Sequence, residues 1–230
     1  DAAPDEEPFA IQQLPQRGRT TAAELADFDG DGRGDLFRSV FSGEPGQEQR
    51  VLELYFQRDD GSLPAAADIR AALPPGAAAY DLAELDAQPG HELLFLARDR
   101  VSVLGFAGRS AATREVALPT PSVAVAPDER GIDRMILVRR GLGPRPRLLI
   151  PGLAEALVLA EDGAPIARLA TGARANYFLP TRDGALASES EVELYLDVPR
   201  LTAGDVDGDG RGDVVATSRY ALLVFLQRDD

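Results

Sequence analysis

The sequence contains no cysteine, no tryptophan and no lysine, and His91 is its only histidine. The absence of cysteine excludes disulfides, thiolate metal ligands and cysteine nucleophiles together. A catalytic triad of the serine-hydrolase type needs a histidine base, and His91 has no obvious serine or aspartate partner in the sequence. No stretch approaches the roughly 20 uninterrupted apolar residues of a membrane-spanning helix. We therefore predict a non-enzymatic protein that does not insert into a membrane.

Positive charge is also scarce. The 24 basic residues, all arginine, face 38 acidic residues, which gives the 230-residue chain a net charge of −14. A surface of this sign repels the phosphates of nucleic acids and of anionic membranes. We therefore predict no nucleic-acid partner, and we expect cations to be the natural counter-species.

One acidic string occurs twice. Residues 27–35 read DFDGDGRGD and residues 205–213 read DVDGDGRGD, and each copy leads through short apolar stretches to the tail QRDD, at 57–60 and 227–230. Residues 84–93 align with residues 27–36 without gaps as an eroded third copy. A weaker fourth copy is predicted at 128–135, and another unit near 176–180. Such self-similarity predicts a protein built from four or five repeats.

The apolar stretches favour strands over helices. They run for five to seven residues, several alternate with period two, and turn residues bound them. The pattern predicts hairpins from residues 36–41 with 51–56, 93–97 with 101–106, and 214–217 with 220–226. Two alanine-rich pieces, 68–73 and 153–157, are predicted as helical turns between the repeats. The expected fold class is all-β.

The acidic string has the spacing of a calcium loop. Its carboxylates alternate along the chain, so that a looped backbone can turn them toward one cation, and Gly32 permits the positive φ of a tight reversal. Hard oxygen ligands favour calcium; magnesium demands a stricter octahedron, and zinc prefers histidine or cysteine. An EF-hand would need helical flanks and a glutamate at position 12, where this chain has Arg38 and Ala216. We therefore predict two calcium sites between strands.

The loops and hairpins resemble the FG-GAP and VCBS repeats of β-propellers, including the calcium-binding blades of integrin α subunits. The resemblance implies four-stranded antiparallel blades, four or five in this chain, in a whole or truncated propeller. It also implies the calcium ligands: Asp27, Asp29, Asp31, the Arg33 carbonyl and Asp35 in one loop, and Asp205, Asp207, Asp209, the Arg211 carbonyl and Asp213 in the other. In the eroded loop the corresponding residues are Glu84, Asp86, Gln88 and Glu92, whose pattern departs from the family by the insertion of Pro89.

The resemblance further implies a calcium-stabilised binding, adhesion or assembly module, with a protein or glycan ligand, outside the cytoplasm: extracellular, on the cell surface or periplasmic. Two other functions remain open, a polysaccharide-active enzyme on a propeller scaffold and a structural part of a surface assembly or filament. Both loops contain the tripeptide Arg-Gly-Asp that integrins recognise. We expect Asp35 and Asp213 to serve as calcium ligands, so that neither is displayed to a receptor.

The repeats define the expected domain organisation. Residues 1–19 are polar and contain proline, as in a leader left after signal or lipoprotein processing. Residues 20–230 contain all the repeats and show no low-complexity linker, so we predict a single domain over this range.

Overall fold

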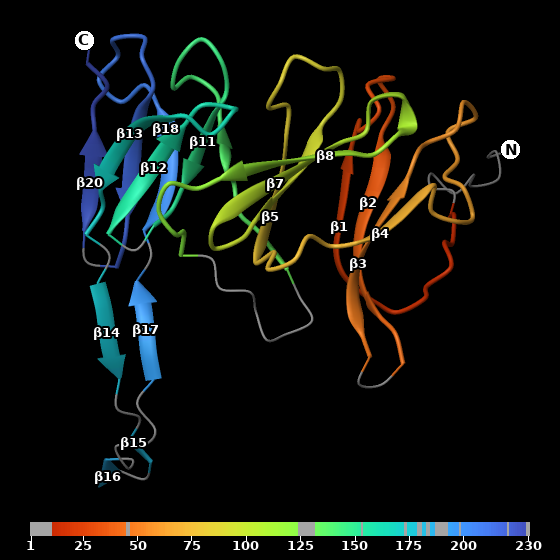
Figure 1. Ribbon diagram of the computed structural model, residues 1–230, viewed down its shortest axis with the longest axis horizontal. Coiled ribbons are helices and arrows are strands. Elements are labelled where there is room, and N and C mark those ends of the chain that lie inside the picture. Colours follow the sequence, from red (N-terminus) through yellow and green to blue (C-terminus); the bar gives the residue numbers. More distant parts are fainter. Residues whose placement is uncertain are drawn as a thin grey trace, which may run out of the picture.

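The computed structural model describes residues 11–44, 47–123, 132–152, 154–172, 174–178, 181–182, 185–186, 193–197, 199–219 and 221–228 (Figure 1). Over these residues the chain is built from β-strands, and its only helical segment is the 3₁₀ turn η1 (Ala107–Arg109). The predicted all-β class is confirmed. Within this part of the chain, no helix has both the length and the apolar character to cross a membrane.

Four sheets contain most of the strands, and their strands pair antiparallel in chain order except for one short strand of the second sheet. The first sheet consists of β1 (Arg19–Ala26), β2 (Asp35–Ser42), β3 (Gln49–Tyr55) and β4 (Ile69–Ala72). The second consists of β5 (Ala79–Ala83), β6 (Glu92–Leu96), β7 (Arg100–Gly105) and β8 (Ala112–Ala117), with β9 (Asp133–Arg134) added in parallel to β5. All three predicted hairpins are present, as β2–β3, β6–β7 and β19–β20.

The third sheet consists of β10 (Val138–Arg139), β11 (Arg147–Ile150), β12 (Glu155–Leu159) and β13 (Pro165–Ala170). The fourth has three strands, β18 (Arg200–Gly204), β19 (Asp213–Thr217) and β20 (Leu222–Phe225). Between these two sheets, β14 (Arg174–Phe178) pairs with β17 (Glu193–Asp197), and β15 (Thr181–Arg182) with β16 (Ala185–Leu186). This paired extension points away from the four sheets (Figure 1).

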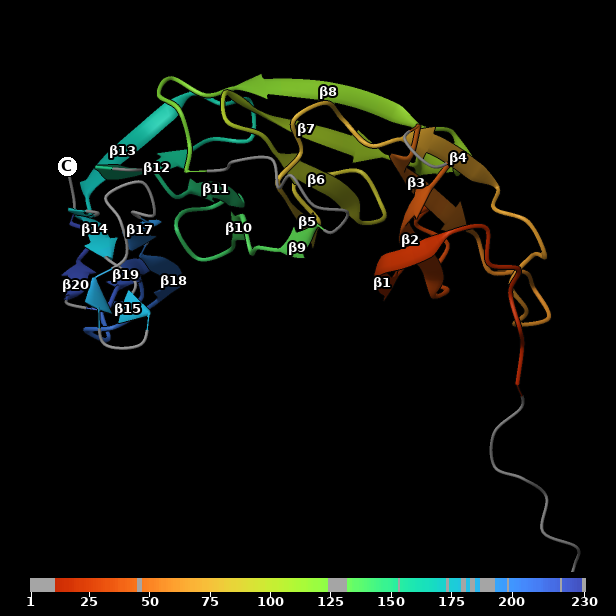
Figure 2. The same ribbon diagram turned by 90° about the horizontal axis from the view of Figure 1, so that it is seen from below.

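The sheets follow one another along an arc (Figure 2). The first and fourth sheets lie at its opposite ends in both views, so the described residues do not form a closed ring (Figures 1 and 2). The expected antiparallel sheets are present, with three to five strands each, whereas the whole or truncated propeller of four-stranded blades stays a prediction.

Neighbouring sheets are held together by apolar residues on both faces of the strands. In β6, Leu93 and Phe95 pack toward the first sheet, whereas Leu94 and Leu96 pack toward the third, as the period-two alternation of a strand requires. The first interface includes the edge-to-face pair Phe28–Phe106, with ring centroids 5.8 Å apart. Each fully buried side chain of this size contributes about 1.5–3 kcal/mol. The fold thus depends on contacts between successive repeats, as repeat architectures generally do.

Two predicted local structures are wrong. The alanine-rich residues 68–73 and 153–157 were expected as helical turns, but residues 69–72 form β4 and residues 155–157 belong to β12, while residue 153 lies outside the described residues. β4 pairs with β3, and Ala156 and Leu157 in β12 are 1% exposed within the sheet stack. Alanine has the highest helix propensity of the amino acids, but intrinsic propensity is a small effect, and here cross-strand pairing and burial outweigh it.

The weaker repeats also fall differently from the prediction. Of the fourth copy predicted at 128–135, residues 128–131 lie outside the described residues, and 133–134 form β9 at the edge of the second sheet. In the third sheet, residues 140–146 form the loop between the first and second strands. The unit predicted near 176–180 contributes β14 to a two-stranded sheet, rather than a further four-stranded one.

Candidate metal centres

The two acidic loops occupy the same position in the first and fourth sheets. Residues 27–34 connect β1 to β2, and residues 205–212 connect β18 to β19. Their glycines have nearly the same backbone angles, with φ of 81° and 84° at Gly30 and Gly32 and of 79° and 85° at Gly208 and Gly210. Residues other than glycine rarely adopt such backbone angles. The local sequence therefore imposes one loop conformation in two different surroundings.

The first aspartate of each loop organises the turn. The backbone N–H groups of Gly30 and Gly32 donate to the two carboxylate oxygens of Asp27, over 2.7 and 2.8 Å. Gly208 and Gly210 donate in the same way to Asp205, over 2.7 and 2.9 Å. In each loop these hydrogen bonds hold the backbone in a turn around the carboxylate of the first aspartate.

The last aspartate connects each loop to the repeated tail. Asp35 accepts hydrogen bonds from the N–H groups of Phe28 and Gln57, both over 2.9 Å. Asp213 accepts from Val206 and Gln227, both over 2.8 Å. The backbone of the QRDD tail is thus hydrogen-bonded to the last aspartate of the loop in the same sheet.

Both of these aspartates are fully buried, with 0% of their surface exposed. Neither Arg-Gly-Asp string therefore displays its aspartate to solvent, as the sequence predicted. The surroundings nevertheless shift the two carboxyl groups in opposite directions. Burial raises the pKa of Asp35, whereas the N–H groups of Gln227 and Val206 lower the pKa of Asp213.

The predicted ligands converge in part. In the first loop, Asp27, Asp29 and Asp35 each offer an oxygen, and these atoms lie within 4.8 Å of one another; in the fourth sheet, Asp205, Asp207 and Asp209 do the same. Three carboxylates at this separation form a hard, anionic donor set that suits calcium. Asp31 and Asp213 lie outside these two groups. The carbonyl ligands at Arg33 and Arg211 stay predictions.

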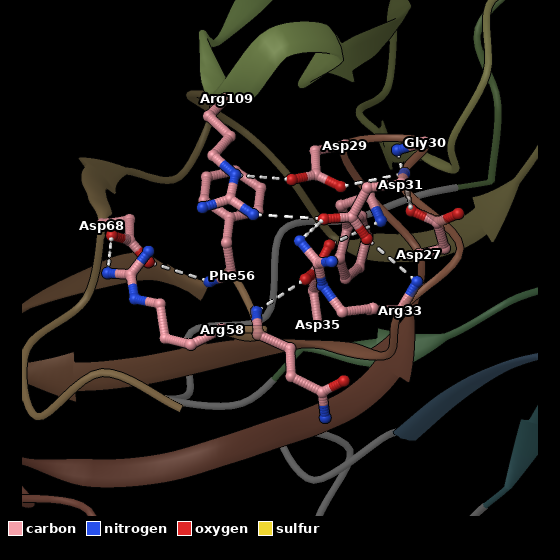
Figure 3. A network of polar contacts seen from close by, with 12 residues as sticks. Asp27, Asp29, Gly30, Asp31, Arg33, Asp35, Phe56, Arg58, Asp68 and Arg109 are labelled. Carbon is pink, nitrogen blue, oxygen red and sulfur yellow. Dashed lines mark hydrogen bonds and ion pairs between the residues drawn. The ribbon is translucent and has the colours of Figure 1, made fainter. Parts of the chain in front are cut away.

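Arg109 distinguishes the first loop from the second. It follows β7 of the neighbouring sheet, and its guanidinium donates to Asp29 Oδ2 over 2.7 Å and to Asp31 Oδ2 over 3.1 Å (Figure 3). Asp31 also pairs with Arg33 of its own loop. The hydrogen bond to Asp29 raises the pKa of Arg109. A residue 80 positions from Asp29 thus supplies a positive charge that the string itself does not predict.

The fourth-sheet loop has no counterpart of this contact within the described residues. Asp209 pairs with Arg211 of its own loop, and no described side chain from another sheet bonds Asp207 or Asp209. Asp205, Asp207 and Asp209 are exposed, whereas the side chain of Asp29 is only 4% exposed. The two loops therefore share their internal bonds and differ in their neighbours.

The eroded loop, residues 84–91, lies in the equivalent position between β5 and β6. Glu92 accepts from the N–H of Leu85 over 2.8 Å, just as Asp35 accepts from Phe28. Burial and the nearby Asp86 raise the pKa of Glu92 to about 7. Asp86 accepts from the N–H of Gln88 over 2.7 Å. Glu84 pairs with Arg140 of the third sheet.

This eroded loop also supports its intact neighbour. The backbone N–H of His91 donates to the Asp27 carbonyl over 2.7 Å, and the ring atom Nδ1 of His91 lies 3.2 Å from the same oxygen. Pro89 lies directly against Gly30. His91 therefore contacts the backbone of the first acidic loop.

The third sheet breaks the acidic pattern. Its equivalent loop, residues 140–146, contains no carboxylate and two arginines, Arg140 and Arg145. Arg140 pairs with Glu84, and Arg145 pairs with Glu161 over 3.0 Å. This repeat position could not be recognised from the sequence, because none of the acidic residues that define the other loops remains.

No protein-family model and no curated protein matches the chain. The FG-GAP and VCBS resemblance therefore rests on the residues of the two acidic loops and their hairpins, and it stays a prediction.

Proposed function

We propose that the chain is a calcium-stabilised repeat module of the propeller type, in which each acidic loop holds one calcium ion and the module serves binding or assembly without catalysis. The observation that carries the proposal is the duplicated geometry: two loops in different sheets have matching hydrogen bonds, and each gathers three carboxylate oxygens within 4.8 Å. Carboxylates this close repel one another unless a cation or proton neutralises them.

The chemistry of the loops favours calcium over other metals. Asp27, Asp29 and Asp35 are oxygen donors on a backbone built around glycines, which suits the larger and more variable coordination shell of calcium. Zinc would prefer nitrogen or sulfur ligands, and His91, the only histidine, contacts the carbonyl of Asp27. The Arg33 and Arg211 carbonyls would complete the two shells.

A structural role for the ion is supported by how the ligands are already used. Asp27 and Asp35 bond backbone N–H groups on the loop and on the tail of the hairpin. An ion bound by the same carboxylates would join β1, β2 and the end of β3. Its benefit would be greatest outside the cytoplasm, where calcium is abundant, and this is the basis for proposing an extracellular, cell-surface or periplasmic location.

Binding of a protein or glycan is the role we propose for the assembled sheets. The loops of all four sheets connect the first to the second strand of each sheet, so repeat geometry gathers them at one end of the stack. Loops carried on a rigid scaffold are common sites of recognition. A screen of the protein against glycan and protein arrays, with and without calcium, tests this part of the proposal. Turnover of a bound polymer would contradict it.

The metal proposal is tested on the whole protein. Calcium should raise the midpoint of thermal unfolding relative to excess chelator, and elemental analysis after dialysis should find close to two calcium ions per chain. The double variant Asp29→Asn with Asp207→Asn should lose both effects. Equal melting midpoints in calcium and chelator, together with no bound calcium, would overturn the proposal.

A further inference from the structure

We propose that Arg109 makes the loop at 27–35 the weaker of two calcium sites, although its sequence nearly equals that of the loop at 205–213. This inference rests on the proposed calcium function and concerns how the two sites are tuned. It predicts stepwise loading, in which the fourth-sheet loop fills first and the first-sheet loop fills at higher calcium.

The position of Arg109 is fixed by its backbone conformation and by a neighbouring aromatic ring. It ends the 3₁₀ turn η1 with φ of 62°, the only positive φ at a residue other than glycine among those described. Such a conformation is uncommon for a residue with a Cβ and is maintained by its surroundings. The guanidinium lies over the ring of Phe56, 5.3 Å from the centroid, and Phe56 is 0% exposed. The backbone and the ring together direct the charge at the loop (Figure 3).

The guanidinium bonds two carboxylates that are predicted to hold the cation, and one of them, Asp29, belongs to the converging group. The contact is through Oδ2 of both Asp29 and Asp31. A calcium ion bound by Asp29 would share that carboxylate with the positive charge of Arg109; the Asp29 side chain is 4% exposed and the Arg109 side chain 38%, so water screens only part of the repulsion. Repulsion between charges this close is substantial where solvent screening is reduced. We expect a loss of about tenfold in affinity.

Arg109 also gives the first loop a partner when no metal is bound. Two carboxylates that would otherwise repel each other are bridged by one guanidinium, a charge-assisted arrangement that stabilises the pair. The fourth-sheet loop has no such bridge from another sheet within the described residues, so its aspartates depend more on an ion. The same arginine thus lowers calcium affinity and preserves the shape of the metal-free loop.

The two sites can be measured one at a time. Asp207→Asn removes a ligand from the fourth-sheet loop and leaves the first loop to be titrated with calcium by calorimetry; Asp29→Asn does the reverse. We expect the first loop to bind about tenfold more weakly than the second. Adding Arg109→Gln to Asp207→Asn should remove most of that difference. Adding it to Asp29→Asn should leave the second loop unchanged.

Two further variants control for charge and for folding. Arg168→Gln removes the same charge from β13, where Arg168 pairs with Glu155, and should change neither affinity. Arg109→Lys keeps the charge but loses the two-pronged contact, and should give an intermediate affinity. Circular dichroism would verify that each variant is folded.

Several outcomes would overturn the inference. One is that the variants Asp29→Asn and Asp207→Asn, each with one intact loop, bind calcium with equal affinity. Another is that Arg109→Gln leaves the calcium affinity of the first loop unchanged or lowers it. If neither loop binds calcium in any variant, the proposed metal function itself fails. Calcium affinities that differ between the two loops, and that become more alike when Arg109→Gln is added, would support both proposals.

Discussion

The loops at 27–35 and 205–213 differ at one position, Phe28 against Val206, yet they occupy very different surroundings. Phe28 is 1% exposed and packs edge-to-face on Phe106 of the second sheet, whereas Val206 is 52% exposed. The internal hydrogen bonds of the two loops nevertheless match to within about 0.1 Å. Local sequence therefore determines the loop's shape, and the neighbouring sheet determines how strongly that shape is supported.

The same contrast extends over the strands behind the loops. Leu52, Leu54 and Phe56 at the end of the first sheet's hairpin are at most 1% exposed, because the second sheet covers them. Their counterparts in the fourth sheet, Leu222, Val224 and Leu226, are 66%, 44% and 44% exposed. Equivalent residues thus stabilise the protein to different extents.

The largest expected difference comes from the residue that differs between the loops. Phe28→Ala should destabilise the protein by about 3–5 kcal/mol, because it leaves a cavity in the interface between the first two sheets. Urea unfolding followed by circular dichroism measures the loss. Phe28→Leu, which keeps most of the apolar volume, should cost clearly less. Equal losses for the two variants would show that Phe28 does not fill that interface.

Calcium removal should distinguish the loops next. At a calcium concentration one hundred times the dissociation constant, a bound ion contributes about 2.7 kcal/mol. In excess chelator, amide hydrogen exchange at Gly208 and Gly210 should accelerate about tenfold more than at Gly30 and Gly32, which keep the bridge from Arg109. Mass spectrometry measures the hydrogen exchange of both loops in one experiment. The same acceleration in both would remove the proposed difference between them.

A smaller effect is expected from the bond between loop and tail. In excess chelator, Asp35→Asn and Asp213→Asn should each cost roughly 1–3 kcal/mol, because the new amide nitrogen cannot accept the backbone hydrogen bond that the carboxylate oxygen accepted. Unfolding midpoints measure both. Asp60→Asn is the control, since among the described residues the Asp60 carboxylate bonds the nearby Ser62 alone. A loss confined to one loop would mean that these bonds depend on the neighbouring sheet.

The smallest effect is expected at Val206. Val206→Thr should change the free energy of unfolding by no more than about 0.5 kcal/mol, because the side chain is mostly in solvent. Thermal unfolding in calcium would measure it. A large loss would reveal a contact that covers this residue in solution.

Much of the fold follows from sequence patterns that act over short distances. The three predicted hairpins, the acidic loops and the repeated tail all depend on alternation, turn residues and spacing within about 35 residues. The strands at 69–72 and 155–159 were missed because their alanine and leucine residues suit either structure locally, and pairing with a neighbouring strand decides between them.

The convergence of carboxylates at the candidate site was predictable from the sequence, and their environment was not. Asp27, Asp29 and Asp35 converge as the spacing predicts, but nothing near Arg109 in the sequence links it to them. Its contact depends on how the second sheet packs on the first. The basic loop of the third sheet was missed for a related reason, since its position in the repeat is preserved by the fold and not by its residues.

Two glycine contacts determine how closely neighbouring loops can approach each other. A Cβ on Gly90 would lie 2.5 Å from the carbonyl oxygen of Phe28, and one on Gly212 would collide with the carbonyl of Gly141. Backbone therefore meets backbone where the first sheet adjoins the second and where the third adjoins the fourth. Any larger residue would act as a wedge at the loop end of the stack and open the angle between two sheets. At these two junctions the peptide chains themselves therefore set how closely the loops of adjoining sheets approach.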